Sequence, residues 1–309
     1  MKLFVGVTDF DWYTYLSSIE NIDEVNFWQP SGDTSFKALE PGELFLFKLH
    51  SPKNFIVGGG FFAHSTILPV SLAWNSFEIK NGATSLIEMR RRIEKYRKAM
   101  PSFDDYSIGC ILLEQPFFFP EEQWIPIPPD WSPNIVRGKR YFMDTEVGRV
   151  LWDQVQQRLQ VGRPVVQPQY EMKDAVARYG APILVAPRLG QGSFRIIVTD
   201  IYNRRCAVTQ EKTLPALEAA HIKPFSDSGP HSVQNGILLR SDIHRLFDSG
   251  YVTVTSDYRF EVSRRIRDEF ENGRDYYVLQ GRRLSIPGEK SMKPSGEFIS
   301  WHNENVYRG

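Results

Sequence analysis

The hydrophobic pattern of the first half of the chain predicts strands separated by turns. Residues 2–8 form a short β-rich run, and residues 42–49 form a second run that alternates poorly, which is typical of a strand buried on both faces. A third apolar run begins at Phe55 and meets three glycines at 58–60, which permit a bulge or a close backbone approach. We therefore predict a β-rich barrel for this part of the protein.

Two later segments have helical periodicity. Residues 85–100 place apolar side chains at helical spacing and basic side chains on the remaining faces. The basic side chains are Arg90, Arg91, Arg92, Lys95, Arg97 and Lys98. They belong either to a solvated surface helix or to a helix that faces phosphate, and both interpretations stay open. Residues 145–159 carry a second apolar stripe, which ends at Gly162-Arg163-Pro164.

The segment between these helices shows a change of composition. Proline and aromatic residues crowd positions 115–133, so we expect this stretch to be extended and not helical. It is either a linker or the last edge of the first domain. Because 309 residues are about twice a typical domain, we expect two domains. We place the N-terminal domain at residues 1–143, a helical linker at 144–180 and the C-terminal domain at 181–309.

Composition and charge narrow the class of protein. A hydrophobic fraction of 41% with 24% charged residues is ordinary for a globular chain and excludes wholesale disorder. The 37 basic residues balance 37 acidic ones, which excludes a globally basic nucleic-acid wrapper but leaves local basic surfaces open. Cys110 and Cys206 are too few for a disulfide framework or a four-thiolate zinc site. Without a secretory leader or a long apolar run, we expect a soluble, cytoplasmic protein.

Two histidines and an asparagine lie in the order His, Asn, His within one short region. His221 precedes Asn235 by fourteen positions, and His244 follows nine positions later. A strand-borne imidazole can act as a general base, while an asparagine in the connecting loop can fix the backbone and the ring. His244 and Asp248 are four residues apart, so a helix would present both on one face to a divalent cation. Each residue alone can be explained by an ordinary structural role, but the three together predict a catalytic site.

This region closely resembles the HNH endonuclease family and its ββα-metal fold over residues 170–257. The resemblance depends on the His-Asn-His order, on Cys206-Ala207-Val208-Thr209 before it and on Leu246-Phe247-Asp248-Ser249-Gly250 at its end. It implies that His221 is the general base that activates water and that Asn235 holds the loop and the base in place. It also implies that His244 binds a divalent metal ion, Mg²⁺ or Mn²⁺, with Asp248 as a plausible second ligand.

The sequence departs from the family at Ala220. Many relatives place a histidine or aspartate immediately before the base as a further metal ligand, and alanine cannot coordinate a metal. Glu218 or water would have to replace that ligand. Relatives often carry paired cysteines that bind zinc, whereas Cys206 stands alone, so we interpret it as a packing residue.

Basic residues near this region are candidates for phosphate contacts. A glycine-rich turn at 190–195 is flanked by Arg188 and Arg195, and Lys223 follows the candidate base. Phosphate binding and an ordinary hairpin turn are both consistent with the 190–195 pattern. Neither a Walker-type phosphate loop nor a set of residues suited to acyl transfer competes with this site.

Four segments of the first half, residues 9–13, 26–32, 41–49 and 56–62, resemble in order an EVE domain of the PUA-like group. The resemblance implies a pocket for a base, commonly a modified one, that has been extruded from the duplex. The stacking candidates are Trp12, Trp28, Phe61 and Trp74, and the candidates that read polar base edges are Asp9, Asn26 and Ser31. Core packing is the alternative for each aromatic residue. We favour Trp28 because it lies among Gln29, Pro30, Ser31 and Gly32.

Together these patterns predict an α+β protein with an N-terminal PUA-like (EVE) β-barrel domain with flanking helices and a C-terminal HNH domain. This combination resembles modification-dependent restriction endonucleases that cut double-stranded DNA carrying modified cytosine, either 5-methylcytosine or 5-hydroxymethylcytosine. Because one active site cuts one strand, we expect a homodimer. Two alternatives stay open: an HNH nuclease of a mobile element, toxin or repair system, and a non-catalytic nucleic-acid reader, which Ala220 motivates.

Overall fold

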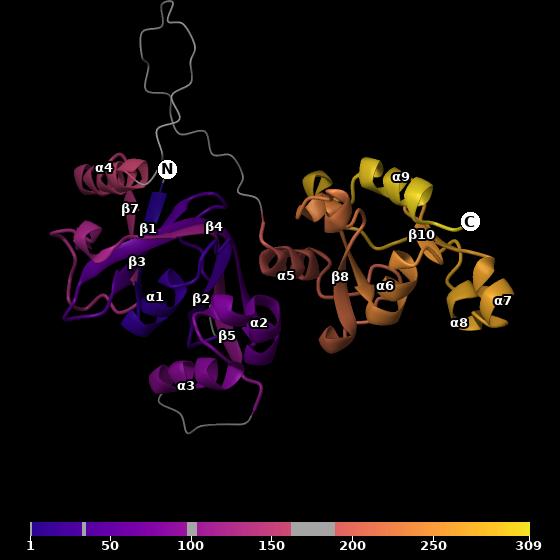
Figure 1. Cartoon of the computed structure of the whole chain (residues 1–309), viewed down its shortest axis with the longest axis horizontal. Helices are drawn as coiled ribbons and strands as arrows, with labels where there is room; N and C mark the ends of the chain where they lie inside the picture. The colour runs from indigo at the N-terminus through magenta and orange to yellow at the C-terminus, as the bar shows by residue number, and fades with distance from the viewer. Residues whose placement is uncertain (1, 33–34, 98–103, 162–188) are drawn as a thin grey trace, which may run out of the picture. The chain divides into compact units, whose positions relative to one another are not determined.

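The computed structural model describes residues 2–32, 35–97, 104–161 and 189–309, and it divides the chain into units 1–187 and 188–309 (Figure 1). Both units combine helices with strands, which confirms the predicted α+β class. Helix α4 (Glu146–Val161), which we had assigned to a linker, places Leu151 and Val155 in the core of the first unit. Its apolar stripe is therefore buried within that unit. No helix of the described residues is long and apolar enough to cross a membrane.

A mixed sheet forms the centre of the first unit. Its strands are β1 (Lys2–Thr8), β2 (Glu24–Gln29), β3 (Leu44–Leu49), β4 (Phe55–Pro69), β5 (Ser107–Phe118), β6 (Ile125–Pro126) and β7 (Gly138–Phe142). They follow the order β2-β5-β4-β3-β1-β7, and β6 pairs with β4. Strands β1 and β3 are parallel, whereas β4 runs antiparallel to both β3 and β5. The register of β4 shifts between Gly59 and Phe61, where the glycine run predicted a bulge.

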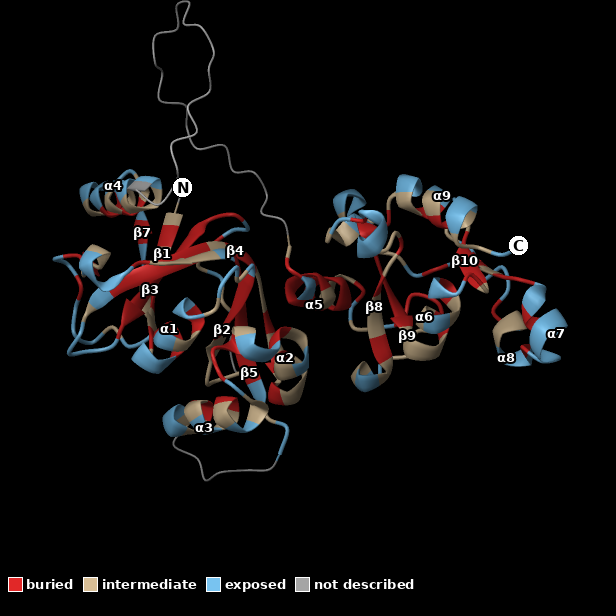
Figure 2. Ribbon diagram, viewed as in Figure 1, coloured by how far each residue is buried: buried red, intermediate tan, exposed pale blue. Residues whose placement is uncertain are grey.

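Strand β3 is buried along its whole length, as the weak alternation of its sequence predicted (Figure 2). Phe45 and Phe47 join an aromatic core that includes Trp12 and Leu16 of helix α1 (Phe10–Ser17). Leu44 and its alternate neighbours face the second core, to which α4 contributes. Figure 1 accordingly shows α1 and α4 on opposite sides of the sheet.

The proline-rich segment belongs to the first unit and is not a linker. Strand β5 continues into it, and Phe119, Ile125 and Trp131 are buried in the core that α4 covers. The expectation that it contains no helix was wrong at one point, because Glu121–Gln123 form a single 3₁₀ turn, η2. Burial of three large side chains therefore fixes this segment against the sheet.

Three further elements complete the first unit: α2 (Val70–Phe77), the 3₁₀ turn η1 (Glu78–Asn81) and α3 (Leu86–Arg97). Helix α3 is the predicted basic helix, and Lys98 to residue 100 lie outside the described residues. Its charges are partly engaged within the unit, because Arg92 pairs with Glu88 at 2.9 Å and Arg97 donates to the carbonyl of Pro30 at 2.6 Å.

The second unit is built around an antiparallel hairpin followed directly by a helix. Strand β8 (Leu217–His221) pairs with β9 (Gly236–Arg240), and α6 (Ser241–Asp248) begins where β9 ends. Helix α5 (Gln191–Ile201) packs on this hairpin. The remaining elements are η3 (Leu214–Ala216), η4 (Phe225–Asp227), η5 (Val233–Asn235), β10 (Val252–Val254), β11 (Phe260–Val262), α7 (Arg265–Phe270), α8 (Arg274–Tyr277), η6 (Lys290–Met292) and α9 (Gly296–Asn305).

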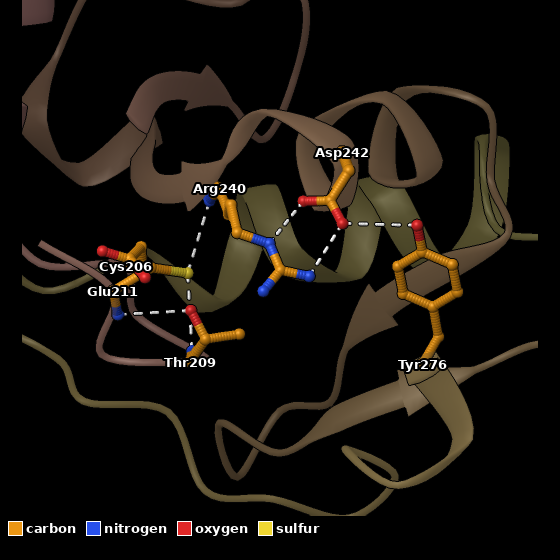
Figure 3. Close-up of polar contacts among 6 residues, drawn as sticks. All are labelled: Cys206, Thr209, Glu211, Arg240, Asp242 and Tyr276. Carbon is orange, nitrogen blue, oxygen red and sulfur yellow. Dashed lines mark hydrogen bonds and ion pairs between the residues drawn. The ribbon is translucent and has the colours of Figure 1, made fainter. Parts of the chain in front are cut away.

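A polar network fixes the start of α6 (Figure 3). The guanidinium of Arg240 donates to both carboxylate oxygens of Asp242, at 2.6 and 2.7 Å, and the hydroxyl of Tyr276 donates to the same carboxylate. These hydrogen bonds from Arg240 lower the pKa of Asp242. The backbone N–H of Arg240 donates to Sγ of Cys206 at 3.3 Å, and this cysteine is fully buried. The network therefore ties α6 to α8 and to the turn that begins at Cys206.

Two glycines allow a matched test of packing after α6. Gly250 and Gly281 have similar left-handed φ angles, 77° and 72°. A Cβ at Gly250 would lie 2.1 Å from the carbonyl oxygen of Val306, whereas a Cβ at Gly281 would meet nothing within 4 Å. Both alanine variants therefore incur backbone strain of about 1–2 kcal/mol, but only Gly250→Ala also overpacks the fold.

We expect Gly250→Ala to lower the free energy of unfolding of the second unit by about 1–3 kcal/mol more than Gly281→Ala does. Chemical denaturation of the full chain, monitored by a signal that reports on the second unit, measures this difference in the free energy of unfolding. Equal losses in the two variants would contradict a rigid contact between Gly250 and Val306.

Candidate functional site

His221 lies at the end of β8, and only one of its two ring nitrogens has a hydrogen-bond partner among the described residues. The ring stacks on Phe194 of α5, with a centroid distance of 3.9 Å and an interplanar angle of 13°. Its Nε2 lies 2.9 Å from Nδ1 of His231. No group of the described residues forms a hydrogen bond with its Nδ1. Burial, followed by the charges of His231 and His244, lowers the pKa of His221 to about 4, so the ring is neutral at pH 7 and can accept a proton.

Asn235 is fully buried and ties together the loop that joins β8 to β9. Its Nδ2 donates to the carbonyl oxygens of Lys223, at 2.9 Å, and Pro230, at 3.0 Å. Its Oδ1 accepts the N–H of Lys223 at 2.9 Å. The side chain thus joins the residues just after His221 to the residue just before His231.

His244 of α6 lies between two carboxylates. Its Nδ1 is 2.6 Å from Oε2 of Glu218, and its Nε2 is 3.3 Å from Oδ2 of Asp248, one helical turn further along α6. An ionised carboxylate can only accept, so we assign the proton to Nδ1, where it is donated to Glu218. Partial burial and the charge of Glu218 raise the pKa of Asp248, against the opposing effect of His244.

This donor set fits a divalent cation held by few protein ligands. A carboxylate on the far nitrogen is the usual partner of a metal-binding histidine, because it fixes the ring and the tautomer. Nε2 of His244 and the carboxylate of Asp248 would then be the ligands, and Glu218 would support the histidine without replacing the ligand missing at Ala220. In the described part of the chain no three His, Cys, Asp or Glu side chains form a metal cluster. Mg²⁺ commonly keeps several waters and binds one or two carboxylates plus phosphate oxygens.

The expected glycine-rich turn at 190–195 is wrong, because α5 begins at Gln191. Burial of Phe194 and Val198 against the β8–β9 hairpin outweighs the turn preference of the glycines. Arg195 lies on this helix beside Phe194 and is partly buried. Nζ of Lys223 lies 5.3 Å from the ring centroid of Trp301. Arg188 lies outside the described residues.

Three residues of the site were not predicted: Phe194, Phe225 and His231. Phe225 stacks on His231 with a centroid distance of 4.7 Å and an interplanar angle of 5°. Of these three residues, His231 could have been predicted from its position between His221 and Asn235 in the sequence. The loop between those two residues must lie near both of them.

A cavity of about 450 Å³ opens in the first unit, beside α1, β2 and α3. Its lining includes Trp12, Trp28 and Ser31 from the predicted pocket, together with Asp9. Trp12 is only 2% exposed and belongs mainly to the aromatic core. Trp28 is half-buried, and because its indole N–H already donates to the carbonyl of Asn81 at 3.0 Å, it offers a ligand its ring surface.

Three predicted pocket residues do not line this cavity. Asn26 is fully buried, and its Nδ2 donates to Oδ1 of Asn81 at 2.9 Å. Phe61 packs against the core on the other face of the sheet, the one that α4 covers. Trp74, the remaining stacking candidate, lies on α2 and is also absent from the lining.

The polar wall of the cavity contains two residues that sequence reasoning missed, His50 and Tyr96. The hydroxyl of Tyr96 donates to Oδ1 of Asp9, and Nε2 of His50 lies 3.7 Å from the same oxygen. Burial, then the hydrogen bond and charge of Asp9, raise the pKa of Tyr96. Asp9 is therefore held at the cavity wall by groups from distant parts of the chain.

Comparisons with known proteins found a match to one family model and similarity to solved structures. Residues 206–255 match the family model of the HNH endonuclease. Among solved structures, the chain is similar to an ASCH protein from Zymomonas mobilis, with a TM-score of 0.34 and 10% identity over 49% of this chain and 94% of the other. It is also similar to the modification-dependent TagI restriction endonuclease, with a TM-score of 0.30 and 12% identity over 98% of this chain and 81% of the other. No curated protein matched the sequence. The family match covers the hairpin and helix that carry His221, Asn235 and His244, and it identifies this region of the chain as an HNH endonuclease domain.

Proposed function

We propose that the protein is a modification-dependent restriction endonuclease that senses a flipped modified cytosine in double-stranded DNA and hydrolyses phosphodiester bonds with its HNH domain. The modified base would be 5-methylcytosine or 5-hydroxymethylcytosine, and the cofactor a single divalent ion, Mg²⁺ or Mn²⁺. One observation carries the catalytic part of the proposal. His221 is neutral and its Nδ1 has no hydrogen-bond partner within the described ranges, while His244 and Asp248 of the same motif present a separate donor set.

In this mechanism His221 is the general base. Its Nδ1 takes a proton from water, the water oxygen forms a bond to phosphorus, and the bond from phosphorus to the leaving oxygen breaks. The buried amide of Asn235 keeps the β8–β9 loop, and with it the base, in place. His244 and Asp248 would hold the divalent ion, which supplies positive charge for the developing negative charge on the phosphate.

The cavity of the first unit supports the sensing part of the proposal. Its volume is within the usual range for a small-molecule site, and extrusion of a base costs a few kcal/mol that stacking and hydrogen bonds must offset. Trp28 would supply the stacking surface. The carboxylate of Asp9 is an acceptor, which suits the exocyclic amine of cytosine and not the carbonyl oxygen of thymine at the same position.

Phosphate contacts and assembly follow from the chemistry of duplex cleavage. Arg195 lies on α5 with Phe194, and Lys223 follows the end of β8, two residues after His221, so we propose that they contact the DNA backbone, as we do for Arg188. Two strands must be cut and each chain has one HNH site, so we propose a homodimer. The donor set of only two side chains favours one rival, a reader that binds modified DNA without cutting it.

The two motif histidines should respond differently to metal. We expect His221→Ala to lower the cleavage rate by about 10²–10⁴-fold at every Mn²⁺ concentration, because no other group replaces the base. His244→Ala should regain part of its activity as Mn²⁺ is raised, because Asp248 remains as a ligand. The measurements are single-turnover cleavage across a Mn²⁺ titration and DNA binding without metal, which both variants should retain. Unimpaired cutting by His221→Ala would refute the mechanism.

A pair of tryptophan variants tests the pocket. Trp28→Ala should lower cleavage of 5-methylcytosine DNA by about tenfold or more, since base stacking is worth about 1–3 kcal/mol. Trp74→Ala removes an indole that does not line the cavity and should leave this rate unchanged. Cleavage of modified duplexes, nonspecific duplex binding and thermal midpoints are compared for both variants. The pocket assignment fails if Trp28→Ala still discriminates modified from unmodified DNA. It also fails if the lower cleavage rate of Trp28→Ala is accompanied by a lower thermal midpoint.

A further inference from the structure

We propose that His231 is a positioning residue of the nuclease site, which accepts the Nε2–H of His221 and so holds that ring in the tautomer whose Nδ1 can take a proton. The inference rests on the proposed role of His221 as the general base. It adds a third histidine to the His-Asn-His motif, from the loop between the first two members.

Ring contacts hold the two histidines in a fixed relation. Nε2 of His221 and Nδ1 of His231 are 2.9 Å apart, with 59° between the ring planes. Each imidazole also lies flat against a phenyl ring, His221 on Phe194 at 13° and His231 on Phe225 at 5°. The stacking sets the ring planes, and the hydrogen bond joins the ring edges.

The backbone between them is fixed by the same buried amide. Asn235 donates to the carbonyl of Lys223, two residues after His221, and to the carbonyl of Pro230, the residue before His231. The Pro230 carbonyl also accepts the N–H of Ser232 at 2.9 Å. These hydrogen bonds hold the loop that carries His231, and so they fix the distance between the two imidazoles.

The direction of the hydrogen bond decides whether His221 can work. A neutral imidazole carries one N–H. If His231 donated, the proton of His221 would lie on Nδ1, and no lone pair would face water. If His221 donates, Nδ1 carries a lone pair with no partner among the described residues. General-base chemistry thus requires His231 to be the acceptor.

The proton balance closes with this assignment. The proton of the attacking water moves to Nδ1 of His221, its oxygen bonds to phosphorus, and the electron pair of the broken bond stays on the leaving oxygen, which takes a proton from solvent. The His221 imidazolium keeps donating Nε2–H to His231 until Nδ1 returns its proton to solvent. Because burial disfavours the charged form of His221, an acceptor at Nε2 lowers the cost of this intermediate state.

Two substitutions separate this role from simple packing. His231→Phe keeps a ring that can stack on Phe225 but removes the acceptor. His231→Asn removes the ring but places an amide oxygen close to the position of Nδ1. Phe225 is 66% exposed, so loss of its stacking partner has little effect on the core.

We expect His231→Phe to lower kcat on a 5-methylcytosine duplex by about tenfold or more with KM unchanged, and His231→Asn to retain most of kcat. Steady-state kinetics with Mn²⁺ and thermal midpoints of all three proteins provide the readout. Parent-like kcat in His231→Phe, or equal losses in both variants, would overturn the proposal.

A second measurement does not need cleavage. In the full chain with ¹⁵N-labelled histidine, NMR should find the proton of His221 on Nε2 in the parent and in His231→Asn, and distributed over both nitrogens in His231→Phe. A parent His221 protonated on Nδ1 would overturn the role of His231. If instead the tautomers follow this pattern and the parent cuts no DNA, the proposed nuclease function fails while the tautomer assignment stands.

Discussion

The nuclease site depends on a single buried amide. Asn235 forms its side-chain hydrogen bonds with the backbone of Lys223 and Pro230, and it is fully excluded from solvent. A buried amide without partners costs about 1–3 kcal/mol, so the loop that supplies those partners is held in one conformation. That conformation brings His231 to His221 and leaves Nδ1 of His221 without a hydrogen bond to any residue that the structure describes. The geometry of the loop, and with it the arrangement of His221 and His231, therefore depends on the side chain of Asn235.

The two histidines of the motif are held in opposite electrostatic surroundings. His221 contacts Phe194 and His231, and no carboxylate forms a hydrogen bond with it in the described part of the chain. His244 lies between Glu218 and Asp248. Burial, followed by the charges of His231 and His244, keeps the first ring uncharged, whereas the carboxylates beside the second ring suit a bound cation. The fold thus separates the proposed proton acceptor from the proposed metal ligands although both lie on one ββα unit.

Sequence reasoning succeeded where the chemistry is local. The weak alternation of β3 was enough to predict burial on both faces, and the four-residue spacing of His244 and Asp248 placed them together on one helix. It failed where tertiary packing decides. The glycines before Phe194 suggested a turn, but burial of that side chain against His221 made the segment helical.

The pocket shows the same limit. Asn26 and Trp28 lie two positions apart on β2 and both donate to Asn81, yet Asn26 is fully buried and Trp28 lines the cavity. No sequence pattern reveals which residue of another segment covers a strand. The same holds for His50 and Tyr96, which reach Asp9 from separate elements.

The most direct test of the account is cleavage of three duplexes that differ only in one base, cytosine, 5-methylcytosine or 5-hydroxymethylcytosine, with Mg²⁺ and Mn²⁺ compared. The account predicts that at least one modified duplex is cut about tenfold or more faster than the unmodified one, a difference of about 1.4 kcal/mol in the barrier. Equal cutting of all three duplexes would contradict base sensing by the first unit. No cutting of any duplex with either metal would contradict a functional nuclease site.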